Sequence, residues 1–294
     1  MKRRGIGIKI VLLCLALVVG VIFTACAPKG VAPPAPGEEK VIKIGSLVDM
    51  TGILADTQGI HWGLVDYWRY VNAEKGGING IPVKLEWGDF SYEVPKAISI
   101  YKRMKGAGIV CISTITGSGS SVVLSCIMVL TLHTTFSTGS AETIINPPGW
   151  MYFNRPSYAD MTCAVADYIM RNWKEERRPK VGFVTWDNEF GRAMFPAIPY
   201  MEEKGIEIGL TEFIPFAPVD ITTQLTKVVE DGADIVFVNV QAPCTASILR
   251  DAERAGVLDK VEWFNMCCSQ VSDDVFMELT GERQSYIHFP DWNC

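Results

Sequence analysis

Short apolar segments alternate with amphipathic helical segments along most of this chain, and that alternation limits the fold more than any other feature. In the first half, segments that are short, apolar and bounded by turn residues read as strands. They are residues 42–48, 83–87, 108–112, 134–136 and 151–153. The second half repeats the pattern at residues 181–186, 206–214, 235–240, 261–264 and 286–289. Strands that alternate with helices predict parallel sheets covered on both faces, with right-handed crossovers.

The helical segment after the first strand shows its period clearly. It begins near Thr57, and its apolar residues recur at the spacing of one helix face. Gly76 and Gly77 can end it, because glycine adopts the left-handed conformation of a helix C-terminus without strain. The sequence therefore predicts a buried stripe on this helix. The stripe consists of Ile60, Leu64, Trp68 and Val71.

Turn residues near the middle of the chain divide the alternation into two halves. Asn146–Gly149 reads Asn-Pro-Pro-Gly, and residues 152–158 then connect the halves. The prediction is an α/β protein with two doubly wound parallel-sheet lobes, lobe 1 at residues 41–155 and lobe 2 at residues 156–294. Further helices are predicted over residues 95–105, from about Ser120 and from near Asp160.

The first 40 residues have a different character. The basic residues Lys2–Arg4 precede an apolar run at residues 10–23, and small residues then lead to Cys26. This order is typical of a secretory signal (residues 1–25), and it resembles a bacterial lipobox in which the thiol of Cys26 carries a lipid. The alternative is an uncleaved membrane anchor, but the run is shorter than the about 20 residues that span a bilayer. The proline-rich residues 26–40 then form a tether, which places the body outside the cytoplasm, lipid-anchored to a bacterial membrane.

Composition narrows the class of function. The 294 residues suffice for two domains of ordinary size. The formal net charge is −6, and an acidic body without a basic stripe argues against a nucleic-acid partner. We therefore expect a small-molecule ligand in preference to nucleic acid.

The cysteines show no metal-binding spacing, so we predict no metal site. Without Cys14 of the signal and Cys26, an odd number remains, and all of them cannot pair within one chain. Mostly buried thiols are the favoured interpretation, although an exported protein could oxidise some of them. The remaining cysteines are Cys111, Cys126, Cys163, Cys244, Cys267, Cys268 and Cys294.

A series of segments in fixed order carries a family resemblance. They run from Ile42 to about Gly281 and include IKIGSLVDMTGILADTQG, WRYVNAEKGGINGIPVKLEWGD, TGSGSS, STGSAE, FNRPSYAD, VGFVTWDNEFGRA, DITTQL, GADIVFVNV and ILRDAERAG. Together they resemble type I periplasmic binding proteins, and most closely the leucine/isoleucine/valine-type (branched-chain amino acid) substrate-binding lipoproteins of ABC importers.

The resemblance implies two lobes around a ligand cleft, joined by three crossing strands and closing over the ligand. It implies a monomeric receptor that delivers a small polar or amphipathic solute (amino-acid-like, an amide or a carboxylate) to an ABC permease, with no cofactor. Relatives continue where this chain ends at Cys294. The C-terminal part of the fold is therefore expected to be missing, unless the protein is naturally short.

Lobe 1 carries the predicted anion site. Ligands of open parallel sheets bind at the carboxyl ends of strands, beside helix N-termini whose free N–H groups attract anions. By the resemblance, the loops at residues 116–121 and 137–142 grip a ligand carboxylate, whereas the plain alternative for the serines is helix capping. Thr57 lies near a position that is often aromatic in the family. The residues expected to contact ligand here are Thr57, Ser118, Ser120, Ser121, Gly139, Ser140 and Ala141.

Lobe 2 departs from the family pattern. Phe190 stands where relatives often carry a tyrosine, and it lacks the tyrosine hydroxyl. Gln241 stands where another aromatic residue is common in relatives. Trp186 is either a residue that stacks on the ligand or plain packing. By the resemblance, Cys267 or a close neighbour in NMCCSQ matches the carboxylate that pairs with a ligand ammonium in amino-acid binders. A thiol cannot supply that charge, and an unpaired buried ammonium is costly. A standard α-amino acid is therefore doubtful, unless Asp187 or Asp160 substitutes.

Two other classes of function stay open. The same fold could sense a ligand for a signalling partner, which the sequence does not separate from transport. An enzyme would need Cys267 or Cys268 as a nucleophile beside His61, His133 or His288. No nucleophile elbow or phosphate-binding loop is present, so we predict that the protein is not an enzyme and has no catalytic residues.

Overall fold

A computed structural model describes residues 40–129, 131, 133–153, 155–267 and 274–289. The predicted signal peptide, the lipidation site Cys26 and tether residues 26–39 lie outside the described residues, as do Cys268 and Cys294. Within the described ranges, every helix is too short or too polar to cross a membrane.

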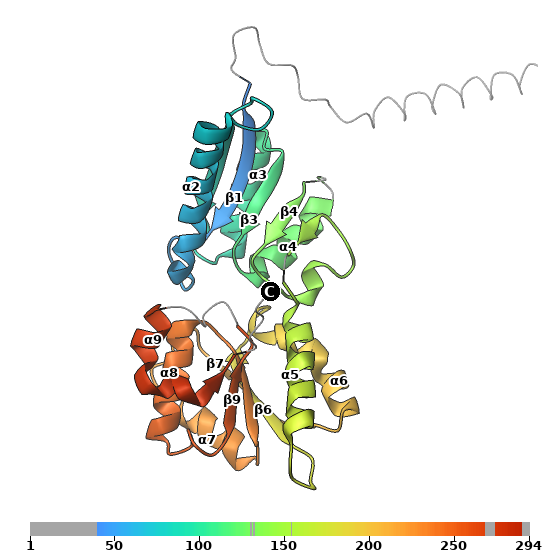
Figure 1. Ribbon diagram of the computed structural model, residues 1–294, viewed down its shortest axis with the longest axis vertical. Coiled ribbons are helices and arrows are strands. Elements are labelled where there is room, and N and C mark those ends of the chain that lie inside the picture. The colour runs from blue at the N-terminus through green and yellow to red at the C-terminus, as the bar shows by residue number, and fades with distance from the viewer. Residues whose placement is uncertain (1–39, 130, 132, 154, 268–273, 290–294) are drawn as a thin grey trace, which may run out of the picture. The chain divides into compact units, whose positions relative to one another are not determined.

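The first sheet is built entirely from the first half of the chain and is parallel throughout (Figure 1). Its strand order is β2-β1-β3-β4-β5. The strands are β1 (Ile42–Val48), β2 (Val83–Asp89), β3 (Cys111–Ile115), β4 (Thr135–Ser137) and β5 (Met151–Tyr152). The helical elements are η1 (Ala55–Thr57), α2 (Gln58–Lys75), α3 (Val94–Gly106), α4 (Ser118–Val129) and η2 (Glu142–Ile144).

The second sheet is also parallel and comes from the second half, with the order β10-β9-β8-β6-β7. Its strands are β6 (Lys180–Trp186), β7 (Glu207–Ile214), β8 (Ile235–Asn239), β9 (Glu262–Asn265) and β10 (Ile287–His288). Its helical elements are α5 (Tyr158–Asn172), η3 (Gly191–Ala197), α6 (Ile198–Glu203), α7 (Thr222–Glu230), α8 (Ala242–Arg254), α9 (Asp274–Thr280) and η5 (Gly281–Tyr286).

Read along the chain, both sheets have the same strand order. In each, the chain moves from the first strand to a neighbour on one side and then crosses to the other side. This reversal opens a crevice at the carboxyl ends of the first and third strands, where open α/β sheets bind ligands. The fold therefore directs attention to the residues that follow β1 and β3 in lobe 1, and β6 and β8 in lobe 2.

The predicted α/β architecture with two parallel sheets is confirmed, and two details are wrong. The third strand lies three residues later than predicted, because Gly108 (φ +81°) ends the turn after α3 in the left-handed conformation. The buried stripe of α2 fails at Ile60, which is exposed, while Leu64 and Trp68 are half-buried. His61 takes the inward position instead, with its ring 4.4 Å from that of Trp87 in β2.

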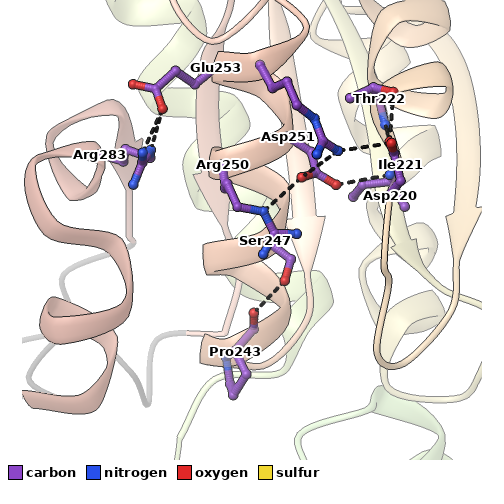
Figure 2. A network of polar contacts seen from close by, with 10 residues as sticks. Asp220, Ile221, Thr222, Pro243, Ser247, Arg250, Asp251, Glu253 and Arg283 are labelled. Carbon is purple, nitrogen blue, oxygen red and sulfur yellow. Dashed lines mark hydrogen bonds and ion pairs between the residues drawn. The ribbon is translucent and has the colours of Figure 1, made fainter.

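Lobe 2 contains a buried charge network that fixes the loop after β7 (Figure 2). The carboxylate of Asp251 in α8 is fully buried and accepts the backbone N–H of Ile221 at 3.0 Å. Arg250 and Arg254 pair with the other oxygen at 3.0 and 3.2 Å. Arg254 also reaches Asp220 at 3.1 Å. Since a buried charge is tolerated when it is paired and hydrogen-bonded, this network ties residues 220–222 to α8.

Candidate functional site

The two serine-rich loops of lobe 1 lie against each other. Ser118 is the first residue of α4 and is fully buried, and Gly139 lies beside it so closely that a Cβ at Gly139 would be 2.7 Å from the Cα of Ser118. Ser121 Oγ and Ser137 Oγ are 2.7 Å apart, which joins the same loops by a hydrogen bond. The sequence predicted both loops for one site, and the structure brings them together.

Two hydroxyls at this point lack a hydrogen-bond partner among the described residues. The Oγ atoms of Ser118 and Ser120 are buried and unsatisfied, although buried polar groups nearly always have a partner. Ser121 Oγ differs, because it donates to Gly117 O at 2.7 Å. The first backbone N–H groups of an α-helix have no partner within the helix, and the helix dipole favours an anion at that end. Ser118 and Ser120 are therefore the candidates in lobe 1 for holding a negative group.

Ser140 and Ala141 serve the connection between the lobes. Arg155 Nε donates to Ser140 Oγ, and its Nη2 donates to Thr138 O and, at 3.0 Å, to Tyr158 Oη. Ala141 is buried and precedes η2. The hydroxyl that the sequence assigned to a ligand is thus engaged by a guanidinium.

A buried carboxyl group lies at the crevice end of β1. Asp49 follows β1 directly, is 1% exposed and accepts a 3.0 Å hydrogen bond from the hydroxyl of Thr116. The backbone N–H of Tyr92 donates to its other oxygen. Burial raises the pKa of Asp49 from 3.8 to about 7, because desolvation disfavours the charged form more than these bonds and Lys96 favour it.

The crevice end of lobe 2 is aromatic. Trp186 ends β6, is buried and has its ring 5.7 Å from that of Phe190 and 5.0 Å from that of Phe216. Phe190 is also buried and packs edge-on against Tyr158 at 5.3 Å. Phe216 is the exposed ring of this cluster, and aromatic rings of this kind suit the apolar part of a ligand.

Gln241 and Cys267 lie side by side at the ends of β8 and β9. Cys267 Sγ is 4.0 Å from Gln241 Oε1, and its backbone N–H donates to Asn265 Oδ1 at 2.8 Å. Cys267 is buried and Gln241 half-buried. Behind them, burial raises the pKa of the Cys244 thiol to about 12, so that thiol stays protonated near neutral pH.

The remaining predicted residues have local partners. Thr57 Oγ1 donates to Leu54 O at 2.7 Å at the start of α2. Asp160 caps α5 by accepting from Ser157, and Asp187 pairs with Arg192 at 2.6 Å. Both aspartates therefore already have a partner of their own within lobe 2.

The two lobes contact each other through Tyr92. Asn188 Nδ2, after β6, donates to Tyr92 Oη at 3.4 Å. The rings of Tyr92 and Phe216 meet at right angles with centroids 6.2 Å apart. Burial and the nearby Asp49 raise the pKa of Tyr92 above its ordinary value. The crevice ends of both sheets thus converge on this tyrosine.

The histidines named in the enzyme alternative pack against aromatic residues or bond a tyrosine hydroxyl. His61 packs between Trp62 and Trp87, His133 Nδ1 bonds Tyr101 Oη at 3.0 Å, and His288 stacks on Phe264. Among the described cysteines none is disulfide-bonded; Cys244 and Cys267 are buried, whereas Cys126 is exposed. The described residues group no three acidic, histidine or cysteine side chains for a metal.

Sequence reasoning missed Asp49, Tyr92, Asn188 and Phe216. A signal existed for Asp49 and Asn188, because each follows the first strand of its sheet within two residues, where the crevice of a doubly wound sheet lies. Tyr92 and Phe216 follow the edge strands β2 and β7. Nothing in their spacing indicated that loops of two different lobes would meet.

Comparison with known proteins agrees with this geometry. The family profile described as periplasmic binding protein matches residues 41–274. A comparison with curated protein sequences finds no match.

Several solved structures share the fold. A fatty acid ABC transporter substrate-binding protein from Thermomonospora curvata aligns with a TM-score of 0.70 at 20% identity, over 81% of this chain and 60% of that chain. A branched chain amino acid ABC transporter from Thermus thermophilus with bound valine aligns with a TM-score of 0.71 at 20% identity, over 83% of this chain and 63% of that chain. A solute binding protein of an ABC transporter from Rhodopseudomonas palustris, in complex with 3,4-dihydroxy benzoic acid, aligns with a TM-score of 0.65 at 14% identity, over 76% of this chain and 61% of that chain. The chain thus spans about three fifths of these solved chains.

Proposed function

Because the chain belongs to the periplasmic binding protein family, we propose that it is an extracytoplasmic receptor that delivers a small carboxylate to the permease of an ABC importer. The observation that carries this proposal is the pair of buried hydroxyls of Ser118 and Ser120 at the N-terminus of α4, which have no hydrogen-bond partner within the described part of the chain. A carboxylate would satisfy these hydroxyls and the free N–H groups together.

The apolar part of the solute would contact lobe 2. Trp186, Phe190 and Phe216 form a continuous ring cluster at the crevice end of that sheet. Aromatic rings of this kind stabilise a bound ring or alkyl chain mainly by excluding water from its surface. We therefore favour an amphipathic acid over a small hydrophilic one.

The solute is proposed to lack an α-ammonium group. At the described end of β9, Cys267 stands where amino-acid-binding relatives carry a carboxylate, and Asp160 and Asp187 are engaged elsewhere. An ammonium without a carboxylate partner would be desolvated at high cost. The fatty acid and dihydroxybenzoic acid named for two similar structures fit this chemistry better than the valine named for a third.

Transport is favoured over sensing, because the similar structures are named as transporter components. The lipid anchor at Cys26, the monomeric state and the permease partner belong to the same proposal. They rest on the signal architecture of the sequence and on the family.

Titration calorimetry of the full chain with 4-hydroxybenzoate, octanoate and L-valine tests the solute class. We expect binding of at least one of the two acids and none of L-valine. Tighter binding of L-valine than of either acid would contradict the proposal that the solute lacks an α-ammonium group. If no carboxylate binds, the proposed solute class, a small carboxylate, is wrong.

The hydroxyls can be tested on the same helix. Ser118→Ala should weaken binding of the acid about 10- to 100-fold, because a hydrogen bond to a charged group contributes about 1.5–3 kcal/mol. Ser125→Ala is the matched control, since Ser125 Oγ donates to Val122 O within α4 at 2.7 Å. A second test, Cys267→Asp with Cys267→Asn as its control, should add affinity for L-valine only in the aspartate variant.

A further inference from the structure

Tyr92 follows β2 and makes three contacts at the candidate site. Its ring covers Gly117, since a Cβ on that glycine would lie 2.5 Å from Tyr92 Cε2. Its hydroxyl accepts from Asn188 Nδ2 at 3.4 Å, and its ring meets Phe216 edge-on. Gly117 directly precedes Ser118, so Tyr92 touches the candidate anion loop of lobe 1 and two loops of lobe 2.

The backbone that presents Tyr92 is strained. Ser91 (φ +51°) and Tyr92 (φ +60°) are consecutive residues other than glycine in the left-handed region. Such conformations are uncommon for residues with a Cβ and persist when surrounding contacts determine them. Here Asp89 Oδ1 accepts the N–H of Ser91 at 2.9 Å, and Lys96 Nζ donates to Ser91 Oγ at 2.7 Å.

Asp49 supplies the corresponding contact for Tyr92 itself. It accepts the N–H of Tyr92 on one oxygen and the hydroxyl of Thr116 on the other. One buried carboxyl group therefore links the ends of β1, β2 and β3. It also fixes Tyr92 relative to the loop that begins at Thr116.

We propose that Tyr92 is the lobe 1 residue that closes the binding site over its solute, and that Asp49 is its positioning residue. The inference rests on the proposed function, because it takes the Ser118 loop as the anion site. The ring forms a wall beside that loop. The hydrogen bond from Asn188 and the ring contact with Phe216 form only when the lobes are together. They therefore stabilise the closed state relative to the open state and shift the population toward the closed state.

Substitution separates the ring from the hydroxyl. With 4-hydroxybenzoate as the probe and the full chain as the protein, Tyr92→Phe should weaken binding about threefold, as for one neutral hydrogen bond. Tyr92→Ala should weaken it at least about tenfold, since the wall and the interlobe contacts are lost together. Tyr200→Phe is the matched control, because Tyr200 Oη donates to Asp167 within lobe 2 at 2.9 Å.

A double-mutant cycle tests the interlobe bond directly. Asn188→Ser removes the donor to Tyr92 and keeps a short oxygen for the N–H of Gly191, which Asn188 Oδ1 now accepts at 2.8 Å. Tyr92→Phe combined with Asn188→Ser should bind no more weakly than the worse single variant. If the losses of affinity in the two single variants add in the double variant, the hydrogen bond between Asn188 and Tyr92 does not stabilise the closed state.

Hydrogen exchange in the ligand-free protein gives a result that does not depend on the solute. Tyr92→Ala should accelerate exchange of the amides at residues 186–191, in the other lobe, while Tyr200→Phe leaves them unchanged. Unchanged exchange in Tyr92→Ala would overturn the inference. If wild-type chain binds no acid but this exchange effect is seen, the solute class fails and the closing role of Tyr92 stands.

The positioning role of Asp49 predicts a pH profile. The charged groups facing it are Asp89 and Lys96, with the Tyr92 N–H and the Thr116 hydroxyl as its donors. Since both donors favour the ionised carboxylate, affinity for 4-hydroxybenzoate should fall as the pH drops through about 7 in the wild-type chain. Asp49→Asn should bind more weakly at pH 8 and show a flat profile between pH 6 and 8. A parallel profile in both proteins would assign Asp49 a structural role alone.

Discussion

Among the described residues, each lobe buries one aspartate, and the two are stabilised in different ways. Asp251 in lobe 2 faces Arg250 and Arg254 and accepts the N–H of Ile221. Asp49 in lobe 1 accepts one backbone N–H and the hydroxyl of Thr116, and the attraction of Lys96 lowers its pKa less than these two hydrogen bonds do. Asp251, which is paired with guanidinium groups, holds the loop at Ile221 in place. Asp49 has no guanidinium partner among its described contacts, and burial raises its pKa to about 7.

The difference follows from where the two aspartates lie. Asp251 is on α8, where its network ties the loop after β7 to a helix (Figure 2). Asp49 lies at the crevice end of β1, directly behind the tyrosine that contacts the other lobe. Uncompensated buried groups with shifted pKa values concentrate at functional sites, so the contrast separates a structural carboxylate from one that serves the site.

The largest expected effect is the pH dependence of stability due to Asp49. Its pKa is raised from 3.8 to about 7, so between these values the folded state binds a proton that the unfolded state has released. The free energy of unfolding should therefore fall as pH rises from about 4 to about 7, by up to about 4 kcal/mol. Asp49→Asn removes this contribution, so its stability relative to wild type should improve over the same interval. Urea denaturation of both proteins at several pH values measures the free energy of unfolding. If it changes with pH in parallel in wild type and Asp49→Asn, Asp49 does not titrate near neutral pH, and the contrast with Asp251 fails.

The next effect concerns Asp251. Asp251→Ala should lower the free energy of unfolding by about 3 kcal/mol at pH 7.5, since it removes charged hydrogen bonds and leaves the buried N–H of Ile221 without an acceptor. Urea denaturation followed by far-ultraviolet circular dichroism gives the value. A loss below about 1 kcal/mol would mean that the network fixes the loop without stabilising the lobe.

The same contrast shows how far the sequence could lead. The alternation of strands and helices, and the meeting of the loops that contain Ser118 and Gly139, follow from patterns of period and turn residues, because parallel strands place their carboxyl ends at one edge. The sequence predicts Trp186 for the site because it ends β6, and it predicts Phe190, which precedes η3, through the family resemblance.

Tyr92 and Asp49 could not be predicted in that way. The role of Tyr92 depends on two successive left-handed residues, and sequence gives no signal for them when glycine is absent. The pKa of Asp49 depends first on its burial and then on the hydrogen-bond donors that reach it in three dimensions, and the spacing of residues in the sequence records neither. The predicted ligand hydroxyl of Ser140 shows the converse, because Arg155 from the connecting segment engages it.

A smaller loss is expected where the two lobe 1 loops touch. A Cβ on Gly139 would lie 2.7 Å from Ser118 Cα, so Gly139→Ala should cost about 2 kcal/mol through overpacking. It should also weaken 4-hydroxybenzoate binding, because the Ser118 loop must move. Gly63→Ala is the control, since a Cβ there meets nothing within 4 Å on helix α2, and it should gain up to about 1 kcal/mol. Thermal unfolding measures the stability of both variants. Equal stability of Gly139→Ala and Gly63→Ala would contradict the close contact between Gly139 and Ser118.

The smallest effect tests whether the lobe 2 network depends on its exposed edge. Asp220 pairs with Arg254 at 3.1 Å and accepts the N–H of Thr222 at 2.9 Å. Asp220→Asn keeps an oxygen for that N–H and removes the charge, so it should lower the free energy of unfolding far less than Asp251→Ala does, because exposed ion pairs contribute little. A loss comparable to that of Asp251→Ala in the same urea titration would show that Arg254 is held from its exposed side. The stability contributed by Asp251 would then depend on the whole group of charges around Arg254. Burial of the Asp251 carboxylate alone would not explain why it differs from Asp49.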